Sequence, residues 1–216
     1  LQLKVPPRRI EAFDISHLGG TNTVASLVCF IDAKAKKSEY RKFKIKTVDG
    51  IDDFASMREI VFRRYKRVKD EGAGLPDLIL VDGGKGQLSM AVSALRELGL
   101  DYLPIVGLAK KLEEVFIPGN SNPQSIHKQS SGLILLRRIR DEAHRFAITF
   151  QREKRKASIS RSIFHDIPGM GDKRVKILLK KYKNVKMISN LSPEKIKNDL
   201  GLSIKIAKDI IKKANA

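Results

Sequence analysis

The sequence of 216 residues contains a single cysteine, Cys29, and no long apolar segment. One cysteine cannot form a disulfide within the chain, so nothing requires an oxidising compartment, and we expect the cytoplasm. The longest apolar runs, at 24–31 and 78–81, are far shorter than the roughly 20 residues that span a bilayer. Glycine and proline together account for only 23 of the 216 residues, which argues against collagen-like and low-complexity chains.

Acidic side chains are scarce relative to basic ones. The chain has 43 Lys and Arg against 24 Asp and Glu, a formal net charge of +19. Residues 151–216 hold 18 basic and 6 acidic side chains, so the excess is concentrated toward the C-terminus. Such a field attracts polyanions, and nucleic acid is the leading expected partner. The first residue is not Met, which suggests an internal piece of a longer protein.

Hydrophobic patterning predicts an α/β domain over 1–153, with a mixed sheet flanked by helices. Expected strands cover 9–15, 23–31, 40–46, 78–81, 105–108 and 114–117. Expected helices cover 52–68, 87–98 and 132–150. A basic segment with few apolar residues, 154–162, is interpreted as a linker, and 163–216 as an all-α domain of short helical hairpins.

Two aspartates stand at the ends of predicted strands. Asp14 lies between Phe13 and Ile15 at the end of the first strand, and Asp82 follows the apolar strand 78–81. If these strands are neighbours in one sheet, both carboxylates project from the same edge and form an oxygen site for Mg²⁺ or Mn²⁺. The alternative is that each aspartate only caps a loop or the following helix.

A glycine-rich turn and a charged helix add two further candidate groups. Lys85 stands in the turn 82–87, where exposed backbone amides and a positive charge favour a phosphate oxygen, although the Walker pattern is absent. His144 shares one helix face with Arg137, Arg140 and Asp141, and its imidazole could bind a metal or transfer a proton. A flexible turn and a solvated charged face are the alternative interpretations.

Two glycine turns in the C-terminal part follow the same pattern. The first contains Gly169 and Gly171, followed by Lys173 and Arg174; the second, about 31 residues later, contains Gly201. Lys205 follows the second turn. Consecutive backbone amides in such turns can hold a phosphate without reading a base, so a tandem repeat that binds DNA is expected. Either turn alone could simply join two helices.

Five ordered motifs resemble the C-terminal half of UvrC, the incision subunit of bacterial nucleotide excision repair. They are residues 13–17, 52–57, 82–87, 140–146 and the glycine turn 167–171. The resemblance covers nearly the whole chain. It implies an RNase H-like endonuclease domain followed by two helix-hairpin-helix motifs, and a cut on the 5′ side of a DNA lesion.

The resemblance also implies roles for particular residues. The family's site combines aspartates with a histidine, and motif by motif these correspond to Asp14, Asp82 and His144, with Asp53 as a fourth member and Asp52 as the less favoured neighbour. Mg²⁺ or Mn²⁺ is the implied cofactor. Implied phosphate-binding or neighbouring groups are His17, Lys85, Arg138 and Arg140.

The implied partners are damaged double-stranded DNA and the damage-loading subunits of the excision complex, of the UvrB type. The segment that contacts those subunits and the module for the 3′ incision are expected in parts of the parent protein not present here. The second hairpin has Leu200 where the family usually has proline before the glycine, so its phosphate contact is expected to be weaker. The alternatives are a catalytically inert DNA-binding scaffold and a general RNase H-like nuclease.

Overall fold

The computed structural model describes residues 3, 5–18, 22–48, 50–109, 114–182 and 185–215, with no account of the side chains at 18, 22 and 150–162. The chain divides into two compact units, Leu1–Gln151 and Arg152–Ala216. The division falls inside one long helix, α3 (Ser131–His165). Within the described residues no helix is long and apolar enough to cross a membrane.

A mixed sheet forms the centre of the first unit. Its strands are β1 (Arg9–Leu18), β2 (Asn22–Ile31), β3 (Lys34–Ala35), β4 (Arg41–Lys44), β5 (Leu78–Val81), β6 (Ile105–Leu108) and β7 (Val115–Phe116). In the described residues the order is β3-β2-β1-β5-β6-β7, with β4 also paired to β2. The pairs β1–β5 and β5–β6 are parallel, and the others are antiparallel. Because parallel strands need crossover connections, helices cover the sheet.

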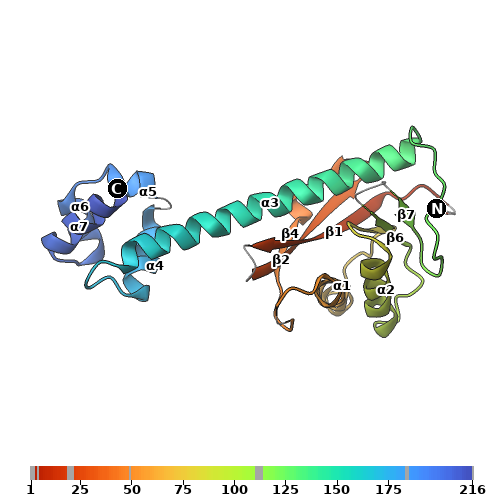
Figure 1. Ribbon diagram of the computed structural model, residues 1–216, viewed down its shortest axis with the longest axis horizontal. Helices are drawn as coiled ribbons and strands as arrows, with labels where there is room; N and C mark the ends of the chain where they lie inside the picture. Colours follow the sequence, from red (N-terminus) through yellow and green to blue (C-terminus); the bar gives the residue numbers. More distant parts are fainter. Residues whose placement is uncertain are drawn as a thin grey trace. The chain divides into compact units, whose positions relative to one another are not determined.

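Helices cover both faces of this sheet (Figure 1). One face packs on α1 (Asp53–Asp70) and α2 (Lys85–Glu97), and alternate residues of β1 such as Phe13 and Ile15 belong to that core. The other face packs on the first half of α3, with Ile10 and Ala12 of β1 in its core. The side-chain alternation of a strand therefore assigns each residue of β1 to one of two separate cores.

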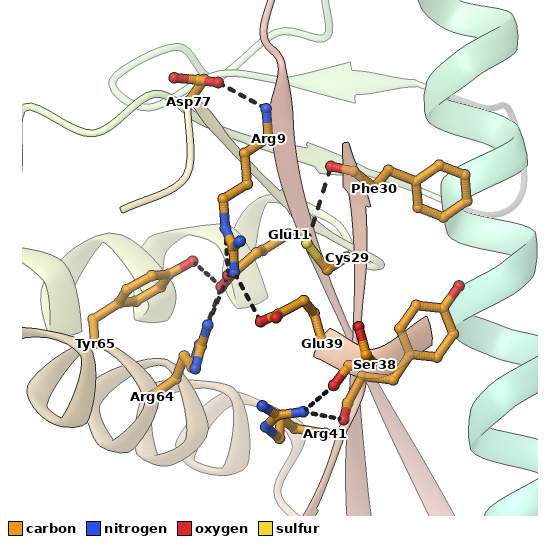
Figure 2. A network of polar contacts seen from close by, with 11 residues as sticks. Arg9, Glu11, Cys29, Phe30, Ser38, Glu39, Arg41, Arg64, Tyr65 and Asp77 are labelled. Carbon is orange, nitrogen blue, oxygen red and sulfur yellow. Dashed lines mark hydrogen bonds and ion pairs between the residues drawn. The ribbon is translucent and has the colours of Figure 1, made fainter. Parts of the chain in front are cut away.

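Polar side chains define the start of α1 and the interior of its core. Asp52 caps the helix, because its carboxylate accepts hydrogen bonds from the backbone amides of Phe54 and Ala55, both at 2.9 Å. Glu11 of β1 is 0% exposed and accepts hydrogen bonds from the guanidinium groups of Arg9 and Arg64. Figure 2 shows these side chains converging between β1 and α1.

The second unit is helical. After α3 come α4 (Asp172–Tyr182), α5 (Val185–Ser189), α6 (Pro193–Leu200) and α7 (Ile204–Ala214), which enclose a core of their own. Ser192 caps α6, because its hydroxyl accepts a hydrogen bond from the backbone amide of Lys195, and Pro193 occupies the first turn. Gly201 ends α6 with φ +60°, a left-handed conformation that favours glycine.

The predicted mixed sheet flanked by helices, and the helical C-terminal part, are confirmed. The strand predicted over 40–46 is shorter, Arg41–Lys44. Tyr40 is the C-cap of a short 3₁₀ helix, η1 (Lys37–Glu39), and the backbone amide of Lys46 donates to the carboxylate of Glu59 in α1 instead of to a strand. The segment interpreted as a linker, 154–162, has helical backbone and belongs to α3. Charged residues favour helix as readily as an irregular linker, and composition alone does not distinguish the two. A linker role for this segment stays a prediction.

Candidate metal-binding site and helical hairpins

The parallel pairing of β1 and β5 brings Asp14 and Asp82 together. Phe13 is the register partner of Val81, and the amide of Asp82 donates to the carbonyl of Phe13 at 2.9 Å. Each aspartate follows this pair directly, so the two carboxylates lie side by side just beyond the end of β5. Asp14 is not at the end of its strand as predicted, because β1 continues to Leu18 through its pairing with β2. Both are buried, with exposures of 1% for Asp14 and 5% for Asp82.

His144 reaches the same place from α3. Its Nδ1 lies 3.5 Å from Oδ2 of Asp14, and Ser16 Oγ donates to that oxygen at 3.3 Å. One ligand atom from each of Asp14, Asp82 and His144 lies within 4.8 Å of the others. We call these three residues the carboxylate–histidine cluster. Ser26 of β2 positions the helix beside it, because its hydroxyl donates to the carbonyl of Ala143 at 3.2 Å.

The donor set fits a hard divalent cation. Two buried carboxylates next to each other repel, and a dication would offset both charges. Mg²⁺ holds its ligands at about 2.1 Å, so neighbouring ligand atoms are about 3 Å apart and opposite ones about 4 Å. The separations in the cluster therefore require only small side-chain adjustments to hold one ion.

Asp53 is the first residue of α1 and lies on the α1 side of the sheet. Its carboxylate contacts Nε2 of His17 and accepts a hydrogen bond from Nε2 of the Gln87 side chain at 3.4 Å. His17 Nδ1 contacts Thr23 Oγ1 at 3.1 Å. His17 is three residues after Asp14 in β1, so its side chain points to the opposite face of the sheet. Asp53 contacts His17 on that face, and among the described residues it is therefore not part of the cluster. A catalytic role for Asp53 stays a prediction.

The predicted cationic groups near the cluster have different surroundings. Lys85 begins α2 and donates to Ser121 Oγ at 2.9 Å. Arg140 lies one helical turn before His144 and donates to Asp141 at 2.9 Å. Arg138 points elsewhere: its guanidinium lies 5.8 Å from the ring centre of Phe30. Arg138 therefore points away from the cluster, and a phosphate-binding role for Lys85, Arg138 and Arg140 stays a prediction.

Gly107 of β6 supports the turn after Asp82. A Cβ atom at this position would lie 2.8 Å from the carbonyl oxygen of Gly83, a backbone atom that cannot move independently. We expect Gly107→Ala to displace the turn and lower the free energy of unfolding by roughly 1–3 kcal/mol. Urea denaturation would measure this. Gly132→Ala, where nothing lies within 4 Å, is the control, and equal stability of the two variants would contradict this role.

The predicted glycine turns lie between helices of the second unit. Gly169, with φ +89°, and Gly171 precede α4, while Gly201 precedes α7. A Cβ at Gly169 would lie 2.9 Å from Cδ1 of Ile206 in α7, so the two hairpins pack closely. A Cβ at Gly171 would meet nothing within 4 Å, which leaves the backbone there open to a ligand.

The basic residues after each turn are exposed, but they differ in their contacts. Lys173 and Lys205 are exposed near the starts of α4 and α7. Arg174 is also exposed, and its Nη1 donates to the carbonyl of Gly169 at 2.8 Å, closing the first hairpin. In the second hairpin Ser203 caps α7 through the amide of Ile206 at 3.3 Å. The two turns are therefore closed by different contacts.

Sequence reasoning did not identify Ser16 and Ser26 as parts of the site. Ser16 is two residues after Asp14 in a strand, so alternation could have shown that both share one face. Ser26 is the register partner of Asp14 across the β1–β2 pair. That register depends on a turn of unknown length, so no sequence signal identifies it.

The mixed sheet with its strand-edge cluster, followed by two helical hairpins, defines an RNase H-like domain joined to a tandem helix-hairpin-helix module. Residues 1–148 match the sequence model of the UvrC RNAse H endonuclease domain, and 163–216 match the SAM-like helix-hairpin-helix tandem. The chain belongs to the UvrC family. The resemblance inferred from its motifs is therefore confirmed.

Curated relatives have the same assignment. UvrABC system protein C of Flavobacterium johnsoniae is 49% identical over 204 residues, and that of Cytophaga hutchinsonii is 50% identical over 205. Each alignment covers 94% of this chain and 34% of the relative, so the chain spans about a third of the length of these proteins.

Similarity to solved structures is weak. Endonuclease V of Ciona intestinalis in complex with DNA has a TM-score of 0.36 at 20% identity, covering 53% of this chain and 50% of that one. Human ENDOV has a TM-score of 0.29 at 25% identity, covering 57% of this chain and 52% of that one.

Proposed function

We propose that this chain is an endonuclease of nucleotide excision repair that hydrolyses a phosphodiester bond on the 5′ side of damage in double-stranded DNA, with Mg²⁺ or Mn²⁺ as cofactor. The observation that carries the proposal is the convergence of two buried carboxylates and one imidazole, from three separate elements, at the edge of the sheet. Membership of the UvrC family supports the same chemistry.

Asp14, Asp82 and His144 would hold the metal ion. When bound, the ion polarises the scissile phosphate and makes an attacking water more acidic. Asp14 is held by the hydroxyl of Ser16, so its carboxylate is oriented before substrate arrives. His144 is 46% exposed, and its imidazole can therefore contact both Asp14 and incoming solvent or substrate. A histidine in this place could bind the ion or transfer a proton.

The second unit would supply duplex affinity that does not depend on base sequence. Its glycine turns expose backbone amides, and Lys173, Arg174 and Lys205 add positive charge near two helix starts. The weaker of the two turns is expected to be the one at Gly201, because Leu200 replaces the family's usual proline.

The relatives' name refers to a UvrABC system. We infer that damage-loading subunits of the UvrB type deliver DNA to this chain in the cytoplasm, through parts of the parent protein outside it. A catalytically inert scaffold would bind the same DNA without cutting it, and a general RNase H-like nuclease would cut hybrids or four-way junctions.

A cleavage assay separates these functions. The full chain is mixed with a lesion-containing duplex already nicked on the 3′ side, and Mg²⁺ or Mn²⁺ is added. A new cut on the 5′ side of the lesion that requires the metal is the expected result. DNA binding without any cut would indicate the inert scaffold, and preferred cleavage of an RNA–DNA hybrid or four-way junction would indicate the general nuclease.

A further inference from the structure

A basic groove lies beside α3 in the first unit, and none of the residues of the carboxylate–histidine cluster lines it. It consists of two hollows of about 710 and 380 Å³, which share Lys37 and Arg145 in their walls. We call it the α3 groove. Its other lining residues are Phe30, Ala35, Tyr40, Arg41, Lys42, Ile134, Arg137, Arg138, Asp141, Glu142 and Phe146.

The contacts of α3 distinguish the groove from the cluster. Glu142 accepts a hydrogen bond from the Tyr40 hydroxyl at 3.0 Å, and the rings of Tyr40 and Phe146 meet edge to face at 5.1 Å. His144 lies between Glu142 and Phe146 in sequence, two residues from each, but its side chain contacts Asp14. Residues two apart on an α-helix point in directions about 160° apart. Tyr40 and Asp14 therefore lie on different flanks of the same helix.

The groove carries an excess of positive charge. Its walls contain six cationic side chains and two carboxylates. Both carboxylates are already in ion pairs, Asp141 with Arg140 at 2.9 Å and Glu142 with Arg145 at 2.7 Å. The Arg145 ion pair holds the pKa of Glu142 below its usual value, so this carboxylate stays charged and the pair stays formed. The remaining excess favours an anionic occupant.

Two aromatic rings in the walls make cation–π contacts with neighbouring basic side chains. Lys42 Nζ lies 5.4 Å from the ring centre of Phe146, and Arg138 lies over Phe30, whose side chain points from β2 toward α3 in Figure 2. Because Lys42 and Arg138 cover these rings, the rings orient the two cations and do not present a face on which a base could stack. Arg41 is likewise fixed, because it donates to the carbonyls of Ser38 and Tyr40. Such an arrangement suits phosphate oxygens, which every base sequence shares.

We propose that the α3 groove binds the phosphodiester backbone of a DNA strand, without base specificity, away from the cleaved bond. Arg138 and Arg145 are seven residues apart on α3, roughly 10 Å along the helix axis, which corresponds to about three nucleotides of a strand. The groove would thereby hold substrate along the flank of α3 next to the face that carries His144. This inference rests on the proposed function, in which DNA is the substrate.

The salt dependence of binding tests the groove. The full chain, without metal, is compared with Lys37→Gln/Arg138→Gln, using an intact duplex and a single strand of the same sequence. Losing two phosphate contacts should weaken affinity and make the plot of log affinity against log salt less steep by about 1.8 for duplex or about 1.4 for single strand. The substrate that shows the change identifies the strand state.

The control is Lys66→Gln/Lys69→Gln, which removes the same charge from exposed positions on α1 and should leave the slope unchanged. An unchanged slope in the groove variant on both DNAs would overturn the proposal. Metal-dependent cutting by the unsubstituted chain is measured separately. Absence of cutting would refute the proposed function and still leave the groove result readable.

Cross-linking gives a second, independent measurement. Cys29 is buried, and burial raises its pKa to about 11, so this thiol reacts poorly with labels. Lys37→Cys can therefore carry a photoreactive label selectively. We expect it to cross-link to bound DNA, whereas the same label at Lys66→Cys should not. Cross-links from Lys66→Cys at equal yield, or none from Lys37→Cys, would contradict the proposal.

Discussion

Asp14→Asn and Asp82→Asn are each expected to lower metal-dependent cutting by about 10³-fold or more and to leave duplex affinity nearly unchanged. Asparagine keeps the size of aspartate but removes the charge that holds a dication. A loss of this size corresponds to roughly 4 kcal/mol of transition-state stabilisation. Affinity should persist because the proposed duplex contacts lie in the second unit and the α3 groove.

The lesion-duplex assay with Mg²⁺ or Mn²⁺ measures the cutting rate, and calorimetric titration with Mn²⁺ measures metal affinity. Both variants should lose metal affinity together with cutting. Asp101→Asn, an exposed aspartate after α2, is the matched control and should behave as the parent chain does. Cutting at the parent rate in either cluster variant would rule out the proposed metal ligands.

Glu11→Ala should be the most damaging substitution for the stability of the first unit. Glu11 is 0% exposed and accepts hydrogen bonds from Arg9 at 2.7 Å, from Arg64 at 2.8 Å and from the buried Tyr65 hydroxyl at 3.1 Å (Figure 2). Its removal would leave the buried Tyr65 hydroxyl and the Arg64 guanidinium without this acceptor, and Arg9 would keep only its longer contact with Glu39, at 3.4 Å. Breaking such a network is expected to cost about 3–5 kcal/mol.

The pH dependence of this effect follows from the direction of the pKa shift. Burial by itself raises the pKa of Glu11, but the hydrogen bonds and charges of Arg64 and Arg9 outweigh it and lower the pKa below its usual value. A carboxyl with a lowered pKa stabilises the folded state above its unfolded pKa of about 4.3. That stability is lost as the pH falls through the folded pKa. The difference between parent and Glu11→Gln should therefore be largest at neutral pH and shrink in acid.

Amide hydrogen exchange of β1 and β5 peptides measures this stability, because these buried strands exchange through unfolding of the first unit. Glu71→Ala is the control. Its partner is Arg67 on the exposed side of α1, and surface substitutions of this kind usually change stability by no more than about 0.5 kcal/mol. Exchange rates in Glu11→Ala equal to those of the control would show that the network does not stabilise the unit.

The residues of the cluster could be named before the fold was known, but their contacts could not. Asp14 and Asp82 were identified because each was expected at the end of a strand, and they meet because β1 and β5 are parallel neighbours. Asp53 was expected beside them on the family resemblance. In the structure it lies on the other face of the sheet with His17, because side-chain alternation separates His17 from Asp14.

Glu11 and the α3 groove illustrate what patterns along the chain do not contain. A glutamate in a strand normally indicates a solvent-facing position, yet Glu11 is buried because Arg9 and Arg64 neutralise it from two different elements. The groove combines η1 and residues of β2, β3 and β4 with residues of α3 that lie about 100 positions later in the sequence. Such pairings arise only when distant segments pack.

The sequence by itself determined the class of fold, the order of most helices and strands, the basic character of the C-terminal unit and the residue types for a metal site. These properties follow from local periodicity, charge and motif, which are present in any short window of the chain. Tertiary structure alone decided which face each side chain occupies, which aspartates meet and where the cations gather, because strand register and helix packing are set by contacts between residues far apart in sequence.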